Sequence, residues 1–80
     1  MTTEIRIQAD EAKRLKNDTA FVRFVDDVRK DQMMIFANSD ASDVDAREEA
    51  HAIIRALKLI EGQLDAAVSA GRLLDRKLKG

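Results

Sequence analysis

Apolar side chains recur at intervals of three and four residues along most of the chain. Between residues 19 and 37 the stripe advances by 4, 3, 4 and 3 positions through Phe21, Val25, Val28, Gln32 and Ile35. This spacing places the side chains on one face of an α-helix about 28 Å long. Asp18, just before the segment, is the predicted N-cap, because its short carboxylate can accept from the free N–H groups of the first turn.

A longer stripe follows from residue 43 and is typical of a coiled-coil seam of more than four heptads. It advances by alternating steps of 4 and 3 through Ala46, Ala50, Ile53, Leu57, Ile60, Leu64, Ala67, Gly71, Leu74 and Leu78. Ser42 and Asp45 have the spacing of a capping box. Gly71 predicts a stop that ends this helix near Ala70. Because the stripe continues to Leu78, a helix that runs past Gly71 remains the alternative.

The segment between the two stripes, Asn38 to Asp43, is the one cluster of turn-forming residues and predicts a helix-to-helix connection. The fold class is therefore predicted as all-α: an antiparallel helical hairpin of about 19–37 and 43–70. Residues 1–17 carry a weaker pattern and predict an N-terminal arm or a short helix over 7–15. We expect one domain, 1–80, made of this arm (1–17), the hairpin (18–70) and a basic tail (71–80).

Composition changes this picture by limiting the core. Eighty residues without cysteine, tryptophan or tyrosine bury little apolar surface, and no disulfide can compensate. The second helix exceeds the first by about two turns, so part of its stripe lacks a partner, and we expect a second copy of the chain to cover it. Gly62 begins a four-residue repeat of small residues, which indicates either a close helix contact or simple tolerance of glycine. The predicted packing and self-association residues are Ala50, Ile53, Leu57, Ile60, Leu64 and Gly62.

The net charge of −1 conceals an uneven distribution. Residues 1–17 carry +1, residues 18–50 carry −5 and residues 51–80 carry +3. The acidic face is predicted at Asp26, Asp27 and Asp31. The basic tail consists of Arg72, Arg76, Lys77 and Lys79. These cations complement the negative end of the long helix, and contact with a phosphate backbone is the less favoured interpretation.

Candidate chemistry is sparse. His51 is the single histidine, and the spacing of the nearby Glu48 and Glu49 is not that of a helical metal site. No glycine-rich phosphate loop or nucleophile motif is present in the sequence. We therefore expect no enzymatic activity, cofactor or metal. The N-terminus, Met1 to Gln8, resembles no secretory signal and no apolar run is long enough to span a bilayer, so a cytoplasmic protein without membrane contact is expected.

One resemblance adds to this reading. A recognisable layout is formed by several short segments in chain order. They are Asn17-Asp18, Ala20-Phe21, Phe24-Val25, an acidic connection, Arg47-Glu48 with the apolar run to Leu64, and finally Ala70-Gly71-Arg72-Leu73. This layout resembles small helical proteins encoded by tailed bacteriophages and prophages. The resemblance implies an accessory protein of the head, neck or packaging machinery, located in the host cytoplasm or the virion.

Three functions follow as hypotheses. The first is a non-enzymatic helical interaction module that forms homo-oligomers, binds another protein, or does both, with a partner helix laid between the two long helices. The second is a regulatory inhibitor that binds a host or phage protein through the acidic face. The third is a packaging adaptor, similar to a terminase small subunit, that contacts DNA through the basic tail.

Overall fold

Residues 2–79 of the protein form three helices of increasing length. The computed structural model describes residues 2–79, with the side chain of Lys79 excepted. Helix α1 spans Thr2–Asn17, α2 spans Thr19–Asn38 and α3 spans Val44–Lys79. No strand occurs in residues 2–79, so the predicted all-α class is confirmed.

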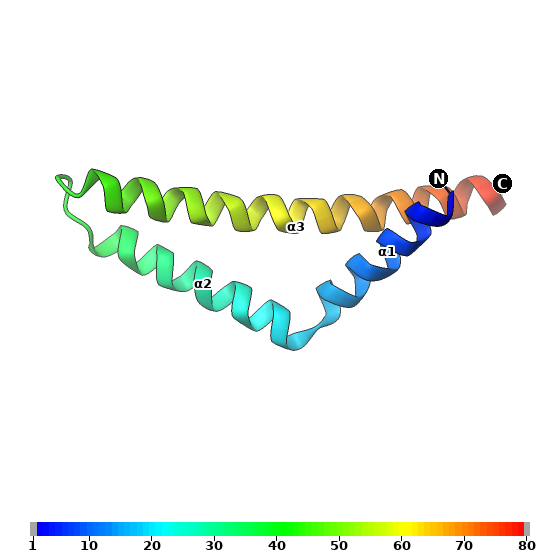
Figure 1. Ribbon diagram of the computed structural model, residues 1–80, viewed down its shortest axis with the longest axis horizontal. Helices are drawn as coiled ribbons and strands as arrows, with labels where there is room; N and C mark the ends of the chain where they lie inside the picture. Colours follow the sequence, from blue (N-terminus) through cyan, green and yellow to red (C-terminus); the bar gives the residue numbers. More distant parts are fainter. Residues whose placement is uncertain (1, 80) are drawn as a thin grey trace.

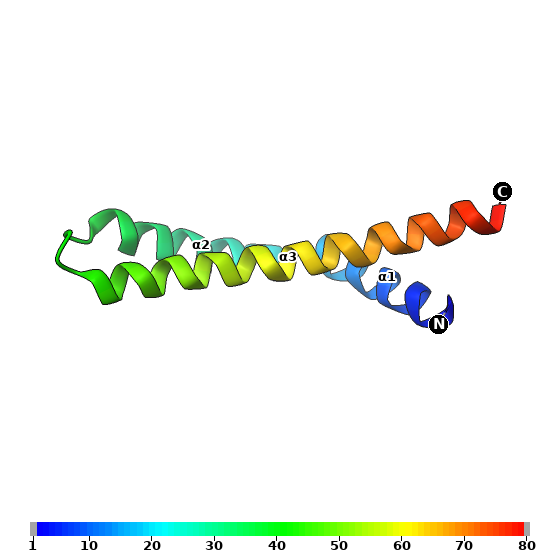
Figure 2. The same cartoon turned by 90° about the horizontal axis from the view of Figure 1, so that it is seen from above.

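Helix α3 is the longest helix, and both α1 and α2 pack against it. Its 36 residues correspond to about 54 Å and extend along nearly the whole 57 Å length. Figure 1 shows that α1 and α2 follow each other along one side of α3 and meet at a vertex that stands away from its middle. Both run opposite to α3, with α2 beside its N-terminal half and α1 beside its C-terminal half (Figures 1 and 2). One side of α3 is therefore covered at both ends.

The vertex is a break of one residue. Asp18 has extended backbone angles, φ −78° and ψ 109°, and its carboxylate accepts a hydrogen bond of 3.0 Å from the N–H of Phe21. The predicted N-cap is confirmed. Helix α1 is longer than the predicted 7–15 and fills almost the whole segment before this cap. The start of α2 is therefore set by local side-chain chemistry.

The connection between α2 and α3 is held by its own polar groups. The hydroxyl of Ser39 donates to the carbonyl of Phe36 at 2.7 Å, and the carboxylate of Asp43 accepts from the N–H of Asp40 at 3.0 Å. Helix α3 begins at Val44, one residue later than a Ser42 capping box requires. The capping-box prediction is wrong, because Asp43 rather than Ser42 immediately precedes the helix.

Helix α3 does not stop at Gly71, which corrects the preferred prediction of a helix ending near Ala70. Gly71 has no positive φ and continues the helix. A Cβ built on it would lie 2.6 Å from the Cβ of Ala9, which is too close for two carbon atoms. The glycine therefore provides room for α1. The expected tail of residues 71–80 is helical as far as Lys79, and Gly80 lies outside the described residues.

The core is small, as the composition predicts. The buried apolar side chains are Ala9, Ala12, Ala50 and Val68, of which three are alanines. The radius of gyration is 17.1 Å, whereas a compact chain of this length has one of about 12 Å. The accessible surface is 6376 Å², against about 4900 Å² for a compact monomer of 9.0 kDa. The isolated chain thus exposes about 1500 Å² more than a compact monomer.

Candidate interaction surfaces

The residues predicted to form one packing seam on α3 have very different surroundings. Ala50 is completely buried, whereas Ile60 is 50% exposed. The remaining apolar members, Ile53, Leu57 and Leu64, are half-buried. Apart from its chain neighbours and the backbone of α3 itself, nothing lies within 4 Å of a Cβ built on Gly62, so this glycine makes no close contact with α1 or α2. The predicted seam is thus divided between the inside and the outside of the molecule.

The division follows from helix geometry. Each residue of an α-helix is rotated by 100° from the one before it, so two stripes with the same 4-and-3 spacing can lie on faces that are offset around the helix. Helix α3 faces α1 and α2 through a second stripe, offset in this way, that shares only every other member with the predicted one. We call this set the inner seam: Ala50, Ile54, Leu57, Glu61, Leu64, Val68 and Gly71.

The opposite side of α3 carries another regular stripe, which the sequence interpretation missed. We call it the outer seam: Ala52, Ala56, Leu59, Gln63, Ala66, Ala70 and Leu73. These residues advance by 4, 3, 4, 3, 4 and 3 positions, and every one is exposed. Leu59 is 66% exposed and Leu73 54%. The same heptad count that identified the first stripe would have detected this one, had each face of the helix been counted separately.

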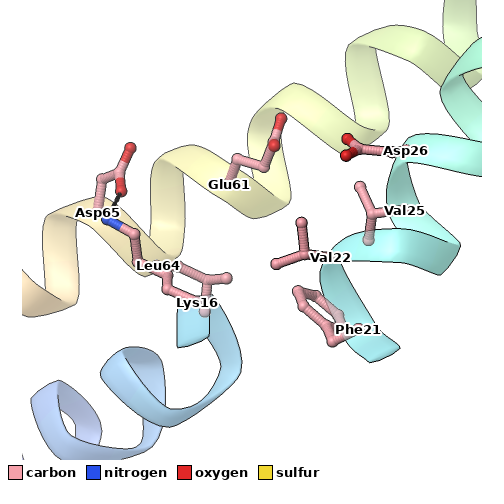
Figure 3. A pocket seen from close by; sticks show the side chains of 8 residues that line it. All are labelled: Lys16, Phe21, Val22, Val25, Asp26, Glu61, Leu64 and Asp65. Atoms are coloured by element: carbon pink, nitrogen blue, oxygen red, sulfur yellow. Dashed lines mark hydrogen bonds and ion pairs between the residues drawn. The ribbon is translucent and has the colours of Figure 1, made fainter. Parts of the chain in front are cut away.

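A cavity of about 350 Å³ lies where the vertex stands away from the middle of α3 (Figure 3). Phe21, Val22 and Val25 of α2 and Leu64 of α3 supply its apolar wall. The other lining residues are charged: Lys16, Asp26, Glu61 and Asp65. These charges form ion pairs at the rim, Lys16 with Asp65 and Glu61 with Arg29. The cavity can therefore accept a small nonpolar group between charged side chains that are paired with one another.

The predicted acidic face is not a single surface. Asp26 is half-buried and pairs with Arg29 at 2.8 Å, and Arg29 also pairs with Glu61 of α3. Asp27 and Asp31 are exposed and lie one turn apart. The structure therefore brings together two of the three aspartates and turns the third toward α3.

The basic residues lie on the last turns of α3. Arg72, Arg76 and Lys77 are exposed, and the side chain of Lys79 lies outside the described residues. Within the same turns, Asp75 pairs with Arg6 of α1 at 3.4 Å. The cations therefore project from a helix that α1 partly anchors.

A shallow recess of about 430 Å³ lies beside the connection between α2 and α3 and is lined partly by His51. The guanidinium of Arg47 lies 4.8 Å from the ring centroid of Phe36 at this recess. His51 itself is exposed. No group of three histidine, aspartate or glutamate side chains in residues 2–79 is arranged to hold a metal ion. His51 is thus a surface residue at the edge of this recess.

Comparison with protein families, curated proteins and solved structures finds no match. Within residues 2–79, the helices lack the apolar length that a membrane-spanning helix requires. Function must therefore be inferred from the surfaces themselves.

Proposed function

We propose that the chain is a non-enzymatic, self-associating helical interaction module. In this proposal the hairpin of α2 and α3 is the unit of association. The observation that carries the proposal is the apolar surface that the single chain leaves exposed. Within residues 2–79, fourteen large apolar side chains are at least 40% exposed, among them Phe24 at 62%, Leu59 at 66% and Leu73 at 54%. Association with another chain would remove part of this apolar area from water.

The total accessible surface of the chain is also large enough to supply an interface. A stable interface removes about 800 Å² from each partner. The chain exposes about 1500 Å² more than a compact monomer of its mass, so it can lose that area to a partner and still have an ordinary surface. Association would also supply the core that four small buried residues do not.

The biological setting that we propose is a tailed-phage particle, in which the chain is a small structural or assembly component of the head, neck or packaging machinery. This setting rests on the resemblance of residues 17–74 to small phage proteins. Genomic neighbourhood tests it: adjacent portal or capsid genes support assembly, whereas a cluster of early genes contradicts it and supports the inhibitor hypothesis.

Sedimentation equilibrium from low to high micromolar chain concentration tests self-association. We expect a concentration-dependent shift from one copy to a defined oligomer, and Leu57→Asp should reduce it because the added charge destabilises the hairpin. Leu57→Asp places a charge on the inner seam and should also lower helicity. Ile60→Asp changes an exposed side chain and should leave helicity intact. A single monomeric species throughout the concentration range would refute the proposal.

DNA binding is the outcome that would favour the adaptor function instead. Binding would have to weaken steeply with salt and be lost when Arg72, Arg76 and Lys77 are replaced by glutamine. Glutamine removes the charge and has a helix propensity similar to that of arginine and lysine. Unchanged binding would indicate that DNA contacts another surface.

A further inference from the structure

We infer that a second copy of the chain docks on the outer seam, with the two α3 helices antiparallel and crossing at Gln63. This inference rests on the proposed self-association and specifies its face and orientation. The outer seam spans about 32 Å of α3, and all seven of its positions are exposed in the single chain. None of these positions carries a charge. The stripe has the heptad spacing that two helices use to pack against each other.

The side chains of the seam favour a close helix pair. Four of the seven positions are alanine, which allows two helix backbones to approach closely, and the leucines at 59 and 73 supply larger apolar area. Gly62 borders the seam, and apart from its chain neighbours and the backbone of α3 itself, nothing lies within 4 Å of a Cβ built there. Gly62 makes no close contact with another helix in the single chain, but in the dimer it would lie at the edge of the contact between the two α3 helices. This accounts for a residue that costs up to about 1 kcal/mol in a helix interior.

Charge selects the antiparallel orientation. Residues 43–49 contain four acidic residues and one basic residue, a net charge of −3, and residues 72–79 contain four basic residues and one acidic residue, a net charge of +3. A parallel pair would place like charges together at both ends. An antiparallel pair brings the acidic end of each α3 toward the basic end of the other. The two helix dipoles then point in opposite directions, which is favourable.

The one polar residue of the seam selects the register. Gln63 stands at the middle, with three apolar positions on either side. In an antiparallel pair centred there, its amide meets the Gln63 amide of the second copy, and each amide can donate to the other because it carries both a donor and an acceptor. A single polar residue in an apolar seam fixes register in this way. The same register places Ala56 level with Ala70, and Glu49 level with Lys77, of the second copy.

Substitution of Leu59 tests the face. Leu59→Asp would place two carboxylates in the dimer interface, one from each copy, and should raise the dimer dissociation constant roughly a hundredfold. Met34→Asp is the matched control, because Met34 is 63% exposed on α2 and lies outside the seam. It should leave the dissociation constant within roughly threefold of the unsubstituted chain. At a concentration where the unsubstituted chain is monomeric, circular dichroism should show unchanged helicity for both variants, since neither side chain is buried.

Disulfide crosslinking tests the orientation, and the absence of native cysteine makes an introduced thiol unique. A mixture of Ala56→Cys and Ala70→Cys chains should form the mixed disulfide under mild oxidation. Neither variant alone should crosslink, because identical positions in the antiparallel pair are about 21 Å apart, whereas a disulfide needs Cα atoms within about 7 Å. A parallel pair gives the reverse result and overturns the inference.

The failure of this inference is distinguishable from failure of the proposed function. A chain that remains monomeric at every concentration refutes both. A chain that self-associates, but whose association is unaffected by Leu59→Asp and whose mixed cysteine variants do not crosslink, refutes the outer seam alone. Association then occurs through another exposed face.

Discussion

The junction of α1 with α3 and that of α2 with α3 are built in opposite ways. At the α1 end the helices meet through small residues: Ala9, Ala12 and Gly71 are buried together with Val68. Helix α2 contains larger apolar side chains, including Phe21 and Val25, yet it has no buried residue at all. The richer apolar stripe therefore forms the looser contact.

This difference shows that packing depends on how closely backbones approach as well as on apolar content. Glycine opposite alanine removes the atoms that keep two helices apart. Phenylalanine and valine keep α2 farther from α3 near the vertex, where the cavity lies. The sides of such large residues then remain exposed to water unless another chain covers them.

The largest expected effect comes from closing the space at Gly71. Gly71→Ala should lower the free energy of unfolding by about 1–3 kcal/mol, because the added methyl group overlaps Ala9 and pushes α1 away. Urea unfolding followed by circular dichroism at one chain concentration measures this change.

Gly62→Ala is the matched control, since it makes the same chemical change on the same helix without a neighbour. At chain concentrations low enough to keep the protein monomeric, it should raise the free energy of unfolding by up to about 1 kcal/mol through helix propensity. Equal stabilisation by both variants would show that α1 does not pack against Gly71.

An intermediate effect is expected at the vertex that separates the two junctions. Asp18→Ala removes the acceptor of the Phe21 N–H and should lower the free energy of unfolding by about 1 kcal/mol. Asp18→Asn should keep most of the stability, because asparagine is an equally good N-cap. The same unfolding assay measures both variants, and an equal loss in both would indicate that charge rather than capping is responsible.

The smallest effect is expected from the ion pairs of the looser junction. Arg29→Met removes the pairs with Asp26 and Glu61 but retains an apolar stem, and should cost less than about 1 kcal/mol because the carboxylates are about half exposed. The difference from the unsubstituted chain should shrink further in ~1 M salt. A loss of unfolding free energy that is large and independent of salt would mean that Arg29 stabilises the protein mainly through the packing of its side chain and not through its ion pairs.

The parts of the fold that were predicted correctly are those set by local sequence. Helix α2 and its cap at Asp18 follow from residues within one turn of each other. The end of α3 does not, because the role of Gly71 depends on Ala9, which is distant in the chain. A glycine followed by a basic residue predicts a helix stop unless another helix is known to lie against it.

The candidate surfaces were predictable only in part, for a related reason. Helix α3 has 4-and-3 spacing on more than one face, and the sequence alone does not show which face α1 and α2 cover. Ile60 and Gly62 were assigned to the same seam as Ala50, although the structure leaves both exposed and Ala50 buried. The pairing of Asp26 with Arg29 likewise divides a face that looks uniform in sequence.

The contact between Ala9 and Gly71 also has a consequence for the order of folding. These residues are 62 positions apart, whereas Phe36 and Arg47, which meet near the α2–α3 connection, are 11 apart. Closing the longer loop costs about 1.5 kcal/mol more in chain entropy. We therefore expect the α2–α3 pair to form first and α1 to dock onto it last, so that the most tightly packed junction of the protein is also the last to close during folding.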